Sequence, residues 1–203
     1  MTNEFLTYWD ETLQSHLRSS IETKKKLLQD NSSRRTVIKI GSLLAEKVKT
    51  GGKILLCGNG GSAADAQHLA AELVIRLRSE YERPGIPAMA LTVDPSIMTA
   101  GGNDIGYENI FARCVQAYGN SNDVLIGIST SGNSENVLRA IKEAKSKGIA
   151  SVGLLGKDGG KILPECDMVY VVDSEVTAHI QEVHITVGHV LCQMIEEIVY
   201  PKD

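Results

Sequence analysis

The chain has 203 residues, of which 42% are hydrophobic, and this length and apolar content suit one domain with a full core. The formal charge is −4, and apart from Lys24, Lys25 and Lys26, expected on a solvated helix face, there is no basic stripe of the kind that binds nucleic acid. No apolar run approaches the ~18 residues of a membrane span, and residues 1–4 do not look like a secretion signal.

Residues 1–52 predict two helices ahead of the first strand. Apolar residues recur at three- and four-residue steps from Leu6 to Leu28, which is typical of an amphipathic helix of more than twenty residues. Residues 31–33 are expected to end it, and Ser33 to cap a second helix that stops at residues 51–52. Neither helix has an obvious partner within a compact α/β core. We therefore expect the first helix to pack on another subunit.

Residues 53–203 alternate between short apolar segments and amphipathic ones. Strands are predicted at 54–57, 87–92, 124–128, 151–155 and 168–172, and helices at 63–78, 107–117, 135–147 and 176–200. This alternation predicts an α/β fold with a parallel sheet of about five strands, covered by helices on both faces. Ligands of such sheets bind at the carboxyl ends of the strands.

A glycine-rich turn, residues 58–63, follows the first strand. It matches the G-x-G-x-x-A pattern of dinucleotide sites, but the acid after the next strand, Asp94, lies well beyond the usual ~20 residues. The turn is therefore expected to let the backbone approach another ligand, with Ser62 as the helix N-cap. Alternatively, it is a turn that simply needs glycine.

His68 and Glu72 lie four residues apart on the helix that follows this turn, and so share one face. Together they can hold a metal or relay a proton, or they can form an ordinary surface pair. Further along, a loop with Asn103 and Asp104 is predicted after a break at residues 101–102. This loop can bind sugar hydroxyls, or serve only as a turn.

The stretch from Ser129 to Ser134 carries four hydroxyl groups in six residues, directly after a strand and before a helix. Free N–H groups and the dipole at a helix start favour an anion. Because no Lys or Arg lies in this serine turn, it predicts a cradle for a phosphate monoester. Capping by Ser131 or Ser134 is the alternative, but it accounts for one hydroxyl and not for four.

The last helix has polar residues in an apolar pattern. Gln181 and His189 can lie on one broad face, and His184 lies on the other side of Gln181. One of these two histidines is expected to be structural, and periodicity does not say which. His179, near the helix start, is expected to be a cap or a surface residue.

The four cysteines, Cys57, Cys114, Cys166 and Cys192, are far apart and form no Cys-x-x-Cys pair. Such spacing is typical of reduced thiols rather than of a disulfide framework or a zinc ribbon. We therefore expect a cytoplasmic protein that binds neither nucleic acid nor membrane.

Taken together, residues 58–72, 103–104, 127–134, 156–160 and 180–189 resemble the bacterial phosphoheptose isomerases, a family with a sugar isomerase (SIS) domain. The resemblance covers nearly the whole chain, whereas the serine turn alone would indicate only the wider SIS family. It implies a flavodoxin-like SIS fold with the SIS domain at 53–203 and oligomerisation helices at 1–52. It also implies a homotetramer whose active sites are shared between subunits.

The resemblance further implies that sedoheptulose 7-phosphate is isomerised, through an enediol, to D-glycero-D-manno-heptose 7-phosphate. This reaction begins the synthesis of ADP- or GDP-heptose precursors for lipopolysaccharide and related glycans. One zinc ion per subunit is implied on His68, Glu72, Gln181 and His189. Implied substrate contacts are Asn59, Gly60, Gly61, Glu72, Asn103, Asp104, Ser129, Thr130, Ser131, Ser134 and Gln181.

In this reading Glu72 is the catalytic base, His189 is the acid and His184 is a supporting residue. One departure from the family pattern is residues 93–95, Val-Asp-Pro, which bears on the loop before Asn103. A non-enzymatic SIS protein would lack the groups at Glu72 and His189, and a regulatory SIS protein would carry a DNA-binding region. An isomerase for a hexose or pentose phosphate stays open.

Overall fold

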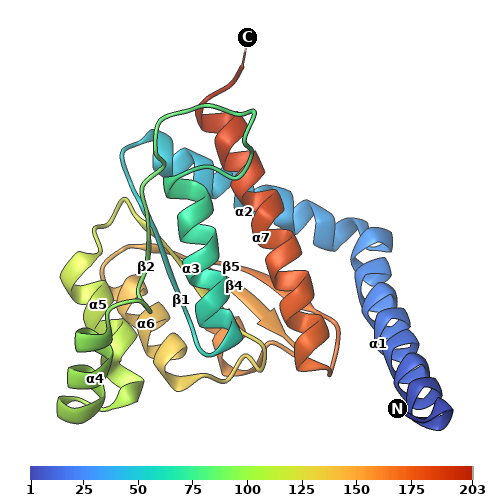
Figure 1. Ribbon diagram of the computed structural model, residues 1–203. Coiled ribbons are helices and arrows are strands. Elements are labelled where there is room, and N and C mark those ends of the chain that lie inside the picture. The colour runs from blue at the N-terminus through green and yellow to red at the C-terminus, as the bar shows by residue number, and fades with distance from the viewer. Residues whose placement is uncertain (203) are drawn as a thin grey trace.

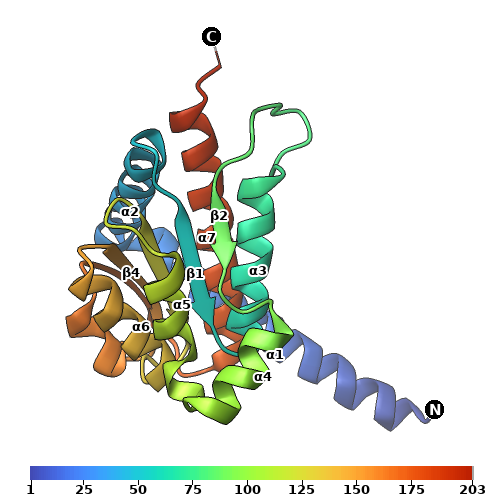
Figure 2. The same ribbon diagram turned by 90° about the vertical axis from the view of Figure 1, so that its left-hand side faces the viewer.

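The computed structural model describes residues 1–202 and centres on one parallel sheet (Figures 1 and 2). The strands pair in the order β2-β1-β3-β4-β5, which is the order of flavodoxin-like sheets. Their bounds are β1 Ile54–Gly58, β2 Ala88–Ala90, β3 Val124–Ser129, β4 Ala150–Gly156 and β5 Met168–Val172. The predicted five-stranded α/β fold is confirmed.

Helices cover both faces of this sheet. Their bounds are α1 Asn3–Gln29, α2 Asn31–Lys49, α3 Gly61–Val74, α4 Pro95–Asp104, α5 Ile110–Tyr118, α6 Glu135–Ser146 and α7 Thr177–Val199, with short 3-10 helices at η1 Tyr107–Asn109 and η2 Gly160–Glu165. Ile54 and Leu56 pack with α2, α3 and α7, whereas Leu55 and Cys57 pack with α5 and α6. Alternate residues of a strand thus enter opposite cores, which explains the continuous apolar runs.

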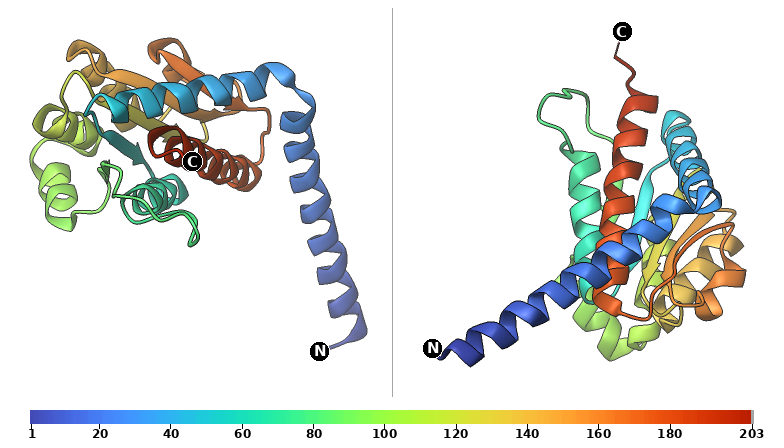
Figure 3. Two further views of the ribbon diagram at one scale, coloured as in Figure 1. Left: turned by 90° about the horizontal axis from the view of Figure 1, so that it is seen from above. Right: turned by 90° about the vertical axis from the view of Figure 1, so that its right-hand side faces the viewer.

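The two N-terminal helices behave differently from each other. In α2, Val37, Ile40 and Leu44 are buried in the main core, so the expectation that this helix lacks a partner is wrong. In contrast, α1 leaves the body at an angle, and Figure 3 shows its N-terminal half projecting away. Trp9 and Leu13 are more than half exposed there.

The boundary between these helices is Asp30, not residues 31–33. The Asp30 carboxylate accepts a hydrogen bond from the Ser32 N–H at 2.8 Å and caps α2. The Ser33 hydroxyl donates to the same carboxylate, so Ser33 is not the cap that the sequence predicts. Asp is among the strongest N-cap residues, and its position here decides where α2 begins.

A helix, α4, replaces the loop expected around Gly101. Asp94 caps it by accepting from the Ile97 N–H at 2.9 Å, and Pro95 occupies its first turn. These helix start signals outweigh the tendency of Gly101 and Gly102 to break a helix. Gly101 also serves packing, because a Cβ there would lie 2.8 Å from Ile110 Cγ1.

The cysteines and the longer helices bear on two further predictions, about thiols and about membranes. The four cysteines are free thiols, and three of them are buried. Within residues 1–202, no helix combines the length and the apolarity needed to cross a bilayer.

Asp123 joins the starts of two central strands, β1 and β3. This carboxylate is 3% exposed and accepts from the Lys53 and Asn120 backbone N–H groups at 2.9 and 2.8 Å, and from the Lys53 ammonium. Burial raises the pKa of Asp123, but the hydrogen bonds from Lys53 and Asn120 outweigh it and hold the pKa below its ordinary value.

We expect Asp123→Ala to lower the free energy of unfolding by about 2–3 kcal/mol at pH 7, because the charged hydrogen bonds are lost. Since the folded pKa is depressed, the contribution of Asp123 is present above the ordinary Asp pKa and fades as the pH falls below about 4. Urea unfolding of the native chain and of Asp123→Ala, at pH 7 and below about pH 4, measures this loss of stability. Asp173→Ala, which breaks an exposed ion pair with Lys26, is the control. Equal effects of the two variants would contradict the assignment.

Candidate active site

The two polar turns lie side by side at the carboxyl edge of the sheet. In the β1–β3 ladder Gly58 is opposite Ile128, so both strands end at the same level. The Asn59 side chain exchanges two hydrogen bonds of 2.9 Å with Asn136 in the first turn of α6, and Tyr107 donates to Asn59 Oδ1 at 3.0 Å. Sequence reasoning singled out Asn59 but missed Asn136 and Tyr107. The signal for Asn136 is a buried amide next to the apolar face of α6.

The glycine turn enters α3 without a side-chain cap. Gly60, with φ +56°, is the N-cap residue, and Ser62 is buried inside the first turn. The predicted capping role of Ser62 is therefore wrong. A glycine is needed at position 60 because of its left-handed backbone. The backbone N–H groups of Ser62 and Ala63 are bound within the turn to Asn59 O and Gly60 O, both at 3.0 Å.

In the serine turn, two of the four hydroxyls face each other and neither caps the helix. Ser129 Oγ and Ser134 Oγ lie 3.0 Å apart, and Ser134 occupies the N-cap position of α6 without a capping hydrogen bond. Ser131 Oγ accepts from the Asn133 N–H at 3.1 Å, and Thr130 is half-buried. The capping alternative thus fails for Ser134, and the turn gathers neutral donors beside a helix N-terminus.

Close backbone contact holds the serine turn in shape. Gly132 has φ +65°, and a Cβ there would meet the Gly159 carbonyl at 2.1 Å. The Gly132 carbonyl accepts from the Ile162 N–H at 3.0 Å. The segment before η2 therefore packs directly on the turn.

Three residues named from the sequence converge between α3 and α7, which run side by side in Figure 1. His68 Nε2 lies 2.8 Å from His189 Nε2 and 3.4 Å from Glu72 Oε1. Glu72 is the more buried partner, with 19% of its side chain exposed against 48% for His68. A carboxylate and two imidazoles from distant segments can therefore act on one bound molecule.

Gln181 approaches the start of α3 from the second turn of α7. Its amide lies against Gly61, where a Cβ would be 2.4 Å from Gln181 Nε2. Gly61 therefore admits the Gln181 side chain of α7 to the start of α3.

His184 is structural in geometry, and His179 lies near the start of the same helix. His184 Nε2 lies 2.9 Å from the Leu155 carbonyl, and burial, only partly offset by this hydrogen bond, lowers the pKa of His184 to about 4. His184 is thus neutral at neutral pH and holds α7 to β4. His179 is 3% exposed, so the expectation of a cap or surface residue is wrong.

Asn103 and Asp104 lie in the last turn of α4, where both side chains are exposed. Asn103 Nδ2 donates to Asp104 Oδ1 at 2.7 Å. The pair is thus presented to solvent by a helix rather than by the predicted loop.

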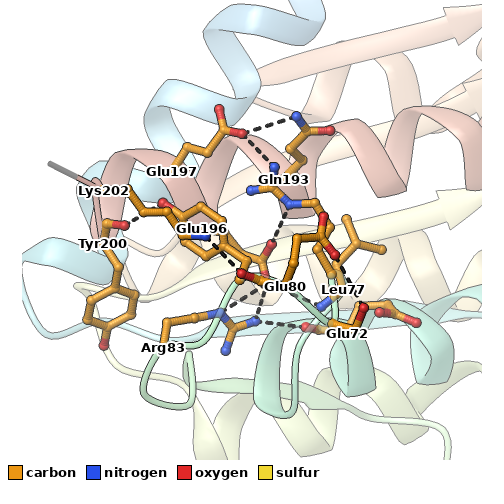
Figure 4. Close-up of polar contacts among 12 residues, drawn as sticks. Glu72, Leu77, Glu80, Arg83, Gln193, Glu196, Glu197, Tyr200 and Lys202 are labelled. Atoms are coloured by element: carbon orange, nitrogen blue, oxygen red, sulfur yellow. Dashed lines mark hydrogen bonds and ion pairs between the residues drawn. The ribbon is translucent and has the colours of Figure 1, made fainter.

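A buried ion pair, which sequence reasoning missed, supports the turn that carries Glu72. Arg83 and Glu196 have side chains 1% and 0% exposed, and their contact is 2.9 Å. Arg83 Nη2 also donates to the Glu72 carbonyl at 2.9 Å, as Figure 4 shows. Glu196 on α7 thus fixes the end of α3 through Arg83. The sequence signal for this ion pair was Glu196, an acid on the apolar face of the last helix.

The donor set between α3 and α7 suits a zinc ion. Two imidazole Nε2 atoms face each other and the Glu72 carboxylate lies 3.4 Å from that of His68, whereas the Gln181 amide lies against Gly61. Tetrahedral zinc keeps nitrogen ligands roughly 3.3 Å apart, which needs only a small widening of the His68–His189 contact. These donor types suit the metal that the sequence resemblance implies, but the ligand atoms of His68, Glu72 and His189 do not all lie within 4.8 Å of one another, so the side chains would have to close up to hold it.

Comparisons with known proteins agree with this architecture. The family model described as "SIS domain" matches residues 17–156, so the chain is a SIS-domain protein. A phosphoheptose isomerase of Clostridium acetobutylicum is 49% identical over 185 residues, covering 91% of this chain and 93% of that protein.

Two solved structures extend the likeness to three dimensions. Phosphoheptose isomerases of Neisseria gonorrhoeae and Francisella tularensis match with TM-scores of 0.85 and 0.87 at 39% and 37% identity. They cover 93% and 92% of this chain, and 99% and 97% of their own chains. The chain belongs to the phosphoheptose isomerase family and is a phosphosugar isomerase.

The contact between Gly61 and Gln181 can be tested by adding a Cβ at position 61. Gly61→Ala would push the Gln181 amide away from the start of α3, so we expect kcat/KM to fall at least tenfold while the circular dichroism spectrum is retained. Gly102→Ala is the matched control, because a Cβ there meets nothing within 4 Å. Similar kinetics for both variants would show that the contact has no role in the site.

Proposed function

We propose that the chain isomerises sedoheptulose 7-phosphate at the edge of the sheet where the serine turn adjoins the α3–α7 cluster. The product is D-glycero-D-manno-heptose 7-phosphate, and the reaction begins heptose precursor synthesis for lipopolysaccharide and related glycans. Family membership supports this activity. The observation that carries the site is the approach of Glu72 and His189 to the same nitrogen of His68.

In this proposal the phosphate binds at the N-terminus of α6. Ser129, Thr130, Ser131 and Ser134 donate hydroxyl hydrogen bonds to it, and the helix dipole adds attraction. The sugar then extends towards α3. Its contacts are Asn59, Gly60, Gly61, Glu72, Asn103, Asp104 and Gln181.

The reaction moves a carbonyl from C2 to C1. The Glu72 carboxylate removes a proton from C1, and His189 donates a proton to O2, which forms a cis-enediol. His189 then takes the proton from O1 as Glu72 returns one to C2, so that the aldose forms and both side chains regain their starting states. His68 lies in contact with both and orients them.

One zinc ion per subunit would be held by His68, Glu72, Gln181 and His189, and substrate would have to release Glu72 and His189 from it for them to carry protons. When bound, zinc supplies a Lewis acid that polarises the substrate carbonyl.

We further propose a cytoplasmic homotetramer whose active sites are shared between subunits. Residues 1–52 serve oligomerisation within the same domain as residues 53–203. Support comes from the exposed apolar row of α1, in which Leu13 and Leu17 are 57% and 51% exposed. A cavity of about 360 Å³ between α1, α2 and α7, lined mainly by apolar side chains, offers a matching surface. Free thiols support the cytoplasmic location.

Glu72→Gln tests the catalytic role. Without the proton acceptor, we expect kcat to fall by about 10²–10⁴ while secondary structure is unchanged. The assay follows sedoheptulose 7-phosphate by NMR, beside fructose 6-phosphate and ribulose 5-phosphate. Glu82→Gln, an exposed acid, is the control. Near-normal turnover of Glu72→Gln would remove Glu72 from the mechanism, and faster turnover of a shorter sugar would reassign the substrate.

Leu13→Glu tests the assembly. A charge in the exposed row of α1 costs the subunit little, but opposes burial against another chain. Sedimentation velocity at micromolar concentration should show a tetramer for the native chain and smaller species for Leu13→Glu. Gln14→Glu, next to the row, should remain tetrameric. A monomeric native chain would refute the assembly.

A further inference from the structure

A second group of possible metal ligands lies where α1 crosses the start of α7. The side chains are His16, His179 and Glu182, and one ligand atom from each lies within 4.8 Å of the others. His16 Nε2 is 3.5 Å from Glu182 Oε1, and the two imidazole rings have centroids 4.7 Å apart. The proposed isomerase mechanism uses none of these three residues.

The buried histidine of this group has an unsatisfied nitrogen. His179 is 3% exposed, and its Nε2 is buried without a hydrogen-bond partner among the described residues. Its Nδ1 lies 3.3 Å from Ser19 Oγ. When Nδ1 carries the proton and donates to Ser19, Nε2 keeps its lone pair, which is the form that binds a metal. A buried polar atom without a partner is costly, and a bound cation would satisfy it.

The placement of the three ligands follows the pattern of metal sites in helical bundles. His179 and Glu182 are three residues apart on α7 and therefore share a face. The third ligand comes from a neighbouring helix, as in sites built from an acid–histidine pair and a facing side chain. The His16 side chain is 49% exposed, so water can fill the fourth position.

We propose that His16, His179 and Glu182 form a second divalent transition-metal site, with zinc or cobalt as the ions that this His₂Glu donor set prefers. The site shares no residue with the α3–α7 cluster. A metal here ties α1, whose N-terminal half leaves the body, to α7 (Figure 3).

Lys24 sets the strength of this site. Its ammonium lies 2.7 Å from Glu182 Oε2, and Ser20 donates to the same oxygen, while Oε1 faces His16. One carboxylate oxygen is thus oriented by its neighbours and the other is left for the metal. The positive charge of Lys24 repels a cation, so its removal tightens binding.

The test uses the full chain, stripped of metal and dialysed against buffered zinc, with bound zinc counted by mass spectrometry. The native chain should bind two ions per subunit. The His68→Ala/His189→Ala double variant should retain one, and adding His16→Ala to it should weaken the remaining site at least tenfold. Lys24→Met in the same double variant should tighten that site severalfold. Glu4→Gln, in the first turn of α1 and away from the ligand set, should leave it unchanged.

Two results would overturn the site. One is a His68→Ala/His189→Ala variant that binds no zinc, and the other is binding to this variant that is insensitive to both His16→Ala and Lys24→Met. Failure of this second site can also be told apart from failure of the proposed isomerase site. If the α3–α7 cluster binds no zinc but the second site does, the native chain should bind one ion per subunit. The single variant His16→Ala should then remove that ion.

Discussion

The close approach of α3 and α7 is the constraint on which the rest of this structure depends. A Cβ at Gly188 would lie 2.7 Å from Leu69 Cδ1, so only glycine allows the two helices this contact without rearrangement. Gly188 precedes His189, and Leu69 follows His68. The same contact that packs the core therefore brings the two ring nitrogens to 2.8 Å.

Both ends of this helix pair are held by the surrounding fold. At the start of α3, the glycine turn and Gln181 fit together without a side chain at Gly61. At its other end, Arg83 binds both the Glu72 carbonyl and the buried Glu196 carboxylate. Breaking one member of a buried ion pair typically costs 3–5 kcal/mol, so this end of α3 has little freedom to move. The backbone that carries the Glu72 side chain is thus held in place.

The sheet supplies the second half of the site. β1 and β3 are neighbours that end at the same level, so the turn that precedes α3 and the serine turn that precedes α6 lie together. The Asn59–Asn136 pair links them directly. Strand pairing thus sets the distance between the start of α6, where we propose that the phosphate binds, and the start of α3, towards which we propose that the sugar extends.

Periodicity and motif spacing predicted the order of elements because each strand and helix is encoded locally. The strand at Met168–Val172 matches its predicted bounds at both ends. Helix α4 was missed because Gly101 and Gly102 look like a break, whereas the cap at Asp94 and the packing on Ile110 are stronger. The choice between His184 and His189 could not be made from periodicity, since it depends on which face of α7 meets α3. Nothing in the sequence pattern marked Arg83, because its ion-pair partner, Glu196, lies 113 residues away in the chain.

The most direct measurement is a double-mutant cycle on kcat/KM with Glu72→Gln and His189→Asn. If the two side chains act on one bound sugar, each single variant already loses the shared proton transfer, and the double variant should fall no more than about tenfold below the worse single one. Losses that multiply, so that the double variant shows the product of both single effects, would mean that the two groups act independently and would contradict the account.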